Sequence, residues 1–149
     1  MTDTVSAEVR KADEEYATTL RALIRHENDV SNHRTTWLMV TQGILAAATA
    51  ALLKEYPWHT VVLAIVAVLV TVSIGHSLKN SYDSRQYFKR LWQSRVTERG
   101  YSMEDVLPLD GGYPGNKAIH WLLPGNFIPW VIVAAWLLLI VYILSQHVA

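Results

Sequence analysis

The chain of 149 residues contains no cysteine and has no excess of charge of either sign. The lack of cysteine excludes disulfides, thiolate metal sites and cysteine nucleophiles. The 13 basic and 13 acidic residues balance. This balance argues against nucleic acid as a partner, because a nucleic-acid-binding domain carries a basic patch or a basic excess. The length predicts a single domain.

Charged residues are also missing from three long apolar runs, at 37–53, 58–75 and 127–144. A transmembrane helix needs ~20 mostly apolar residues to cross the hydrocarbon. A soluble helical domain would instead mix apolar and charged residues in amphipathic stripes. The sequence therefore predicts an all-α integral membrane protein with three transmembrane helices. Pro129 is expected near the start of the third helix, where its missing N–H is tolerated.

The basic residues are distributed unevenly around these runs. Only Lys54 of the 13 lies between the first two runs, and none follows the third. Because lysine and arginine concentrate in cytoplasmic loops, we expect a plasma (inner) membrane protein with its N-terminus inside and its C-terminus outside. Aromatic anchors are expected at the inner boundary (Trp37, Trp121, Trp130) and at the outer boundary (Tyr56, Trp58, Tyr142).

Glycine and proline are nearly absent from residues 5–53 and 58–99, where Gly43 and Gly75 are the only ones. Each stretch therefore predicts one long helix that continues from water into the membrane. The short KEYP segment between them predicts a tight turn and an antiparallel hairpin. The expected single membrane domain has a cytoplasmic helix 1–36, spans 37–53 and 58–75, a cytoplasmic helix 76–100, a loop 101–126 with a short interfacial helix, and a span 127–144.

Each cytoplasmic stretch carries an apolar stripe at helical spacing, which needs a partner helix. The first stripe is predicted at Val9, Ala12, Tyr16, Leu20, Leu23, Val30 and Trp37, and the second at Leu78, Tyr82, Phe88, Leu91 and Trp92. A turn at 54–57 places Tyr16 opposite Arg95, Leu20 opposite Leu91, and Leu23 opposite Phe88. Within the membrane, small residues are expected to let the helices approach closely: Gly43, Ala47 and Ala51 against Ala64, Ala67, Thr71 and Gly75.

A polar passage, HENDVSNHRTTW, occupies residues 26–37 just before the first span. Its candidate site residues are His26, Glu27, Asn28, Asp29, Asn32, His33 and Arg34, and the hairpin adds His76 near His33 or Arg34 and Arg85 near Glu27 or His26. The favoured interpretation is a polar collar. Ionic groups at membrane depth are retained when they are paired, so the collar would pair Glu27, Asp29, Arg34 and Arg85.

Two other interpretations of this passage stay open. The same groups could receive a ligand or a partner from outside. Alternatively, His26, Asp29, His33 and His76 could bind a transition metal, which imidazole and carboxylate ligands suit, although no motif such as HExxH supports this. No cofactor is expected. Gln42, inside the first span, is either a hydrogen-bonding group between helices or a pore-lining residue.

Two resemblances rest on these residues. Glu27, Asn28, Asn32, His33, Arg34, Thr36, Trp37, Gln42 and Gly43 follow a pattern that resembles one found in small uncharacterised bacterial multi-pass membrane proteins. The plan of cytoplasmic helix, membrane hairpin and second cytoplasmic helix resembles the two-span, SLATT-like effector domains of bacterial defence systems, with a third span added. The second resemblance implies a membrane effector, and neither supplies a catalytic residue.

The sequence thus predicts a small homo-oligomeric membrane protein that is not an enzyme and acts as a channel-like or membrane-disrupting effector. One alternative is a membrane anchor whose cytoplasmic helical hairpin binds a protein partner. A second alternative is a metal-dependent membrane enzyme built on the histidines.

Overall fold

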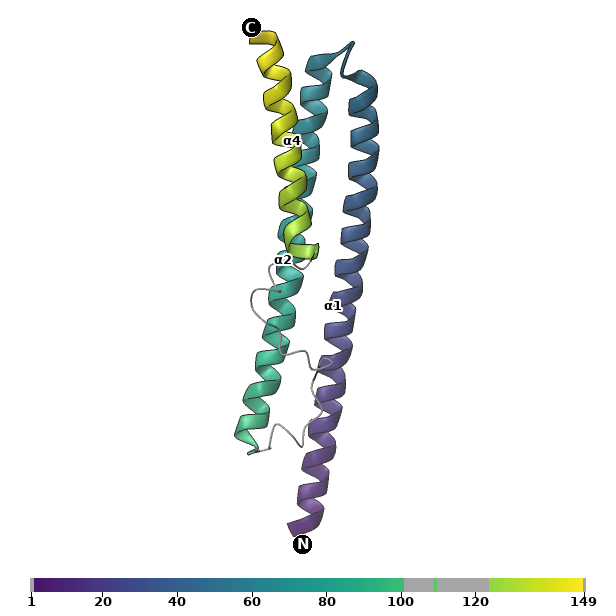
Figure 1. The fold of residues 1–149 in the computed structure, drawn as a ribbon. Helices are drawn as coiled ribbons and strands as arrows, with labels where there is room; N and C mark the ends of the chain where they lie inside the picture. The colour runs from purple at the N-terminus through teal and green to yellow at the C-terminus, as the bar shows by residue number, and fades with distance from the viewer. Residues whose placement is uncertain (1, 101–108, 110–123, 149) are drawn as a thin grey trace. The chain divides into compact units, whose positions relative to one another are not determined.

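Three helices make up the part of the chain that the structure describes (Figure 1). This computed structural model describes residues 2–100, 109 and 124–148. Helix α1 spans Thr2–Leu52, α2 spans Pro57–Glu98 and α4 spans Pro124–Val148. No strand occurs within the described ranges, and the predicted all-α class is confirmed.

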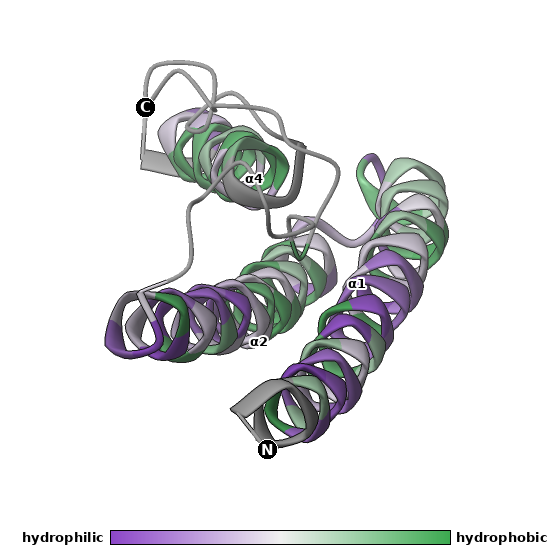
Figure 2. Cartoon of the chain, turned by 90° about the horizontal axis from the view of Figure 1, so that it is seen from below, coloured by the Kyte–Doolittle hydropathy of each residue, from purple (hydrophilic) through white to green (hydrophobic). Residues whose placement is uncertain are grey.

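Each helix contains a segment that is long and apolar enough to cross a membrane. The three candidate spans lie within Ala7–Leu52, Pro57–Glu98 and Phe127–Gln146, so each predicted apolar run falls in a helix of its own. Figure 2 shows the hydrophilic residues of α1 gathered toward its N-terminal half, whereas α4 is mostly hydrophobic. The third helix is thus apolar almost throughout, while the first two also carry long polar portions.

The helix ends follow from backbone chemistry. Pro57 opens α2, where its fixed φ suits the first turn. Gly100, with φ of 67°, follows the end of α2, in a conformation that glycine adopts without steric cost. Pro129 lies inside α4, which begins at Pro124. It thus lies near the start of the helix, as expected, but after the first turn, because the helix starts earlier than the apolar run.

The chain packs as two compact units. The first, here called the two-helix unit, is Met1–Val30 with Ser81–Gly115, and the second, the three-helix unit, is Ser31–Asn80 with Asn116–Ala149. The loop predicted over 101–126 lies outside the described residues, with two exceptions. Leu109 is buried in the two-helix unit, and residues 124–126 belong to α4.

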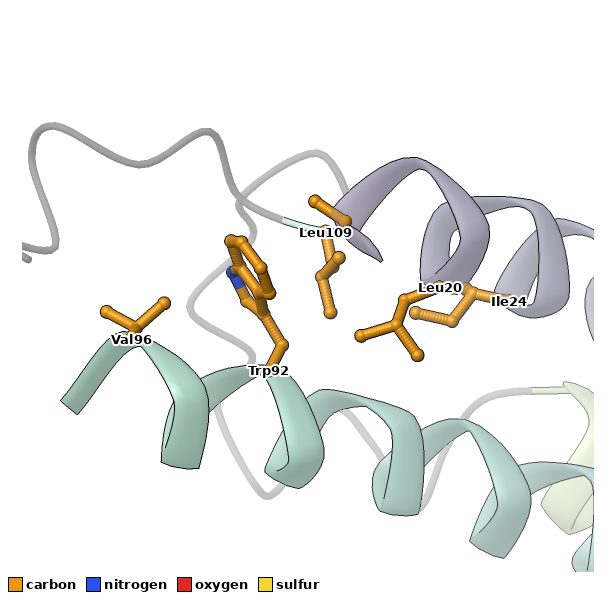
Figure 3. Packing of buried hydrophobic residues seen from close by; sticks show 6 residues of the cluster. Leu20, Ile24, Trp92, Val96 and Leu109 are labelled. Carbon is orange, nitrogen blue, oxygen red and sulfur yellow. The ribbon is translucent and has the colours of Figure 1, made fainter. Parts of the chain in front are cut away.

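The core of the two-helix unit joins one face of α1 to one face of α2. It consists of Ala17, Leu20, Ile24, Trp92, Val96 and Leu109, with Tyr16 and Phe88 packed against it. Figure 3 shows Leu20 from α1 and Trp92 from α2 pointing into the same cluster. The α1 face is turned from the predicted one, because Ala17 and Ile24 are buried while Leu23 is 40% exposed.

The core of the three-helix unit draws on all three helices. Ala64, Ala67 and Trp136 are buried together, with Leu45, Val68, Ile132, Leu139 and Ile140 packed against them. The small side chains lie on α2, which leaves room for the large indole of Trp136 from α4. Small residues at contacts between membrane helices allow this close approach.

Candidate functional site

The centre of the three-helix unit is a polar junction at Gln42, which is 8% exposed. The Nε2 group of Gln42 donates to Thr71 Oγ1 at 2.9 Å and to the Ala67 carbonyl at 3.3 Å, both on α2. Gln42 Oε1 accepts from Trp136 Nε1 on α4 at 2.6 Å. One side chain of α1 is therefore hydrogen-bonded to both other helices.

The junction satisfies its own polar groups. Thr71 is fully buried and its hydroxyl donates to the Ala67 carbonyl at 2.7 Å while it accepts from Gln42. The Trp136 indole has one donor, and that donor is used. Of the two roles open to Gln42, the contacts are those of an interhelical hydrogen-bonding group. Polar groups inside an apolar span need such partners.

The small residues of the two spans lie differently. On α2, Ala67 and Thr71 are fully buried, as expected. On α1, Gly43, Ala47 and Ala51 are exposed, and a Cβ added at Gly43 would meet nothing within 4 Å. The prediction that this α1 stripe packs on α2 is wrong. Gln42 faces α2 instead, and it turns the neighbouring Gly43 outward.

Two further contacts hold the three helices together near one end of this unit. Arg34 Nη1 on α1 donates to the Ser77 carbonyl on α2 at 3.2 Å. A Cβ at Gly75 on α2 would lie 3.2 Å from Pro129 Cβ on α4. This is a tight contact, so the absence of a side chain at Gly75 favours the close approach of α4 to α2. Because Gly75 and Ser77 are within one turn of each other, both contacts lie at one level.

The residues of the polar passage are mostly exposed. His26, Asn28, Asp29, Asn32 and His33 are exposed on α1, and so is His76 on α2; Glu27, Arg34 and Arg85 are partly buried. The contact between Arg34 and Ser77 brings His33 and His76 to the same level of the three-helix unit. The expected approach of His76 to His33 or Arg34 stays a prediction.

The predicted network of Glu27, Asp29, Arg34 and Arg85 is not what the contacts form. In the two-helix unit, Arg85 Nη1 donates to Asn28 Oδ1 instead of pairing with Glu27 or His26. Within residues 2–100, 109 and 124–148, no recorded ion pair includes Glu27 or Asp29. An amide therefore holds the arginine where a carboxylate was expected, while Asp29 is exposed and Glu27 is partly buried.

The buried ion pair of the two-helix unit is at Asp13 instead. Asp13 is 4% exposed, and its Oδ1 accepts from Arg95 Nε at 2.7 Å while its Oδ2 lies 3.6 Å from Arg99 Nε. The Arg95 guanidinium also stacks 4.7 Å from the Tyr16 ring centroid, as the predicted pairing of Tyr16 with Arg95 required. Sequence reasoning missed Asp13, although an arginine on an apolar face is a signal that a carboxylate faces it.

The geometry does not assemble the metal alternative. Throughout the described parts of the chain, no three His, Asp or Glu side chains are grouped closely enough to hold a metal ion. His26, Asp29, His33 and His76 all belong to those parts. The polar contacts of the described residues are hydrogen bonds and ion pairs that hold the helices together.

Comparisons with protein-family models, with curated proteins and with solved structures find no match to this chain. The two resemblances drawn from the sequence therefore stay predictions. The functional argument rests on the contacts of the chain itself.

Proposed function

We propose that this chain is an oligomeric integral membrane protein that acts without catalysis, as a channel-like or membrane-disrupting effector. The observation that carries the proposal is the outward face of α1. The other spans expose large aliphatic residues such as Val62, Leu69 and Leu138, whereas residues 43–51 of α1 expose mainly small residues, among them Gly43, Ala47 and Ala51. The large aliphatic residues that the α1 span exposes are Met39, Val40 and Ile44. Small residues are enriched where membrane helices meet one another, so this face suits contact with a second copy.

The junction at Gln42 bears on how such a protein would act. It fills the centre of the three-helix unit with groups that are already hydrogen-bonded. A path for ions through one copy is therefore unfavourable, and conduction or disruption needs several copies. We infer that an assembly of chains, joined through α1, is the active form.

The membrane placement and orientation belong to the same proposal. Exposed aromatic side chains flank the apolar segments, with Trp37 and Trp130 on one side and Tyr56 and Tyr142 on the other, as aromatic belts do at membrane interfaces. The basic asymmetry puts the Trp37 side in the cytoplasm. We further propose that α1 and α2 form one continuous hairpin, whose polar halves are cytoplasmic.

The experiment reconstitutes the protein into liposomes at increasing protein-to-lipid ratio and measures release of an entrapped ion-sensitive dye. An assembly of copies predicts release that rises more steeply than linearly with density. Gly43→Leu should reduce release by blocking close approach of α1 helices. The matched control is Val62→Leu, at a position on α2 that is 59% exposed. This variant should leave dye release unchanged. No release at any density would overturn the effector proposal.

A second candidate is a membrane anchor whose cytoplasmic part docks a protein. The observation in its favour is that the two-helix unit has its own core and buried ion pair, separate from the apolar spans. An anchor predicts no dye release, together with a stoichiometric soluble partner that binds the full chain in nanodiscs. A metal-dependent enzyme, the remaining alternative, predicts bound metal in the purified protein.

A further inference from the structure

Thr49, near the end of α1, is 5% exposed, and its hydroxyl has no hydrogen-bond partner among the described residues. A threonine inside a helix commonly donates to the carbonyl four residues earlier. Six other threonines of this chain do so: Thr19, Thr35, Thr36, Thr60, Thr71 and Thr97. Because nearly all buried polar groups in proteins have a partner, the Thr49 hydroxyl points to a ligand.

Thr49 lies on the face of α1 that meets α2. It follows Gln42 by seven residues, which is close to two full helical turns, so the two side chains leave the helix on the same side. Gln42 hydrogen-bonds to Thr71, and Arg34, earlier on α1, hydrogen-bonds to the carbonyl of Ser77. The contacts move toward the start of α2 as they move toward the end of α1, so the helices are antiparallel in this unit. Thr49 should therefore face α2 about two turns before the partners of Gln42.

At that position α2 carries Thr60 and Ala64, which are both 0% exposed. They precede the two α2 partners of Gln42 by seven residues each, so they lie on the same side of α2. The short turn between α1 and α2 also keeps these positions close, and the carbonyl of Tyr56 in that turn accepts from both the N–H and the hydroxyl of Thr60. The hydroxyl groups of Thr49 and Thr60 therefore belong to facing, buried sides of one helix contact.

The buried face of α4 supplies an apolar residue here. Pro129 approaches Gly75, and Trp136 is buried with Ala67, so α4 advances toward the start of α2. Seven residues after Trp136, the next residue of this buried face is Ile143, which is 4% exposed. Isoleucine has no polar side-chain atom, whereas the indole of Trp136 donates a hydrogen bond in the layer below it. The unpaired hydroxyl thus needs a partner that the side chain of Ile143 does not supply.

We propose that Thr49 and Thr60 bind one water molecule between α1 and α2. The Thr49 hydroxyl donates to the water oxygen, and the water donates to Thr60 Oγ1, whose own hydrogen goes to the Tyr56 carbonyl at 3.2 Å. A buried water commonly joins polar groups that do not bond directly. It would link α1 to α2 near the turn, as Gln42 links them at the centre. The inference uses only contacts of the three-helix unit, so it goes beyond the proposed function and does not depend on it.

The first test measures thermal unfolding of the full chain in detergent micelles after valine substitutions, which keep the shape of threonine and remove its hydroxyl. A bound water predicts that Thr49→Val lowers the melting temperature by about 4 °C, because the water loses its donor. A hydroxyl without a ligand predicts the opposite sign, since an apolar group is then better buried. Thr60→Val should also lower the melting temperature. The matched control is Thr35→Val, whose hydroxyl donates within α1 at 2.9 Å, and it should have a much smaller effect.

A crystal structure of the full chain tests the ligand directly. We expect electron density for a water within about 3 Å of both Thr49 Oγ1 and Thr60 Oγ1. A map in which the Thr49 hydroxyl donates to the Leu45 carbonyl, with no water beside it, would overturn the site. A higher melting temperature for Thr49→Val, or equal effects of Thr60→Val and Thr35→Val, would overturn it too. If Thr49→Val does not fold, the wild-type map and the Thr60→Val comparison decide. None of these measurements uses dye release, so the water site and the proposed function can fail separately.

Discussion

The indole N–H of Trp136 donates to Gln42 Oε1 at 2.6 Å, and this bond joins helices that are far apart in sequence. The same amide donates to Thr71 on α2. Its orientation is therefore fixed by partners on two sides: the oxygen faces a donor and the nitrogen faces acceptors. Loss of this one side chain would leave polar groups on both other helices without their partner inside an apolar core.

The first prediction follows from this bond. Gln42→Met keeps an unbranched side chain of similar size but leaves the Trp136 N–H buried without an acceptor, which should lower the free energy of unfolding by about 1–3 kcal/mol. Denaturant unfolding in detergent micelles measures it. Together with Trp136→Phe the losses should be less than additive, with a coupling of about 0.6–1.7 kcal/mol, the range found for hydrogen bonds between membrane helices. Strict additivity would mean that the two groups do not interact.

The second prediction compares two glycines of the spans. Alanine is a better helix former than glycine by ~1 kcal/mol, so Gly43→Ala, which adds a methyl group in open space, should hold or raise the melting temperature. At Gly75 the same methyl group would lie 3.2 Å from Pro129 Cβ. Gly75→Ala should therefore melt below Gly43→Ala, and Gly75→Leu should melt far below the wild type. Equal melting of the two alanine variants would show that α4 does not approach α2 at this turn.

The contrast between these glycines shows which features of the fold could be predicted from the sequence and which could not. Apolar runs without charge predicted three helices, and the lack of glycine and proline predicted their length; both follow from local chemistry. Which face of α1 turns inward does not follow locally. Asp13 and Gln42 are buried because partners on other helices, Arg95, Thr71 and Trp136, satisfy them. The apolar stripe therefore placed Leu23 in the core, where Ile24 is buried instead. The small-residue stripe placed Gly43 against α2, where Gln42 is hydrogen-bonded instead.

The candidate site divides in the same way. The level of Arg34 and His76 could be predicted from an antiparallel pairing with a turn at 54–57. The hydrogen bond of Arg85 to Asn28 rather than to Glu27 could not be predicted. The reason is that neighbouring positions on a helix point about 100° apart. A pairing that is correct to within one residue can still name the wrong side chain.

The third prediction concerns Asp13. Asp13→Asn keeps the shape and removes the charge, which leaves Arg95 and Arg99 beside each other without their shared carboxylate. Thermal unfolding of the two-helix unit, followed by circular dichroism of the full chain, should shift clearly downward. Glu14→Gln is the matched control, because the Glu14 side chain is 60% exposed in its ion pair with Arg21, and exposed pairs contribute little. A control that loses as much stability as Asp13→Asn would refute the special role of the buried carboxylate.

The fourth prediction concerns topology. Reporter fusions after Ala149 and within residues 110–116 should report opposite sides of the membrane, with the internal fusion in the cytoplasm. The reason is that Lys54 is the one basic residue between the first two spans, and none follows the third. The control is Lys54→Gln. This variant should keep the same orientation, because it removes the one basic residue that opposes the predicted orientation. Two fusions on the same side would refute three spans.

The last prediction tests the pairing of α1 with α2 in the two-helix unit. The chain has no cysteine, so introduced pairs are the only thiols present. Ala17 and Val96 are 0% and 2% exposed and belong to one core cluster. The pair Ala17→Cys with Val96→Cys should therefore form a disulfide within one chain when the protein is expressed and folds under oxidising conditions. Both positions are small, so the substitutions cost little packing.

Two controls make this result specific to the observed face and to a single copy. Thr18 is exposed, next to Ala17 on α1, so Thr18→Cys with Val96→Cys should link much more slowly. Mixing copies of different tag size distinguishes links within a chain from links between chains. Fast linking by the Thr18 pair would place the other face of α1 against α2, and the burial of Asp13 and Leu20 would then be wrong as well, because they share the Ala17 face. Links only between copies would refute an antiparallel pairing within one chain.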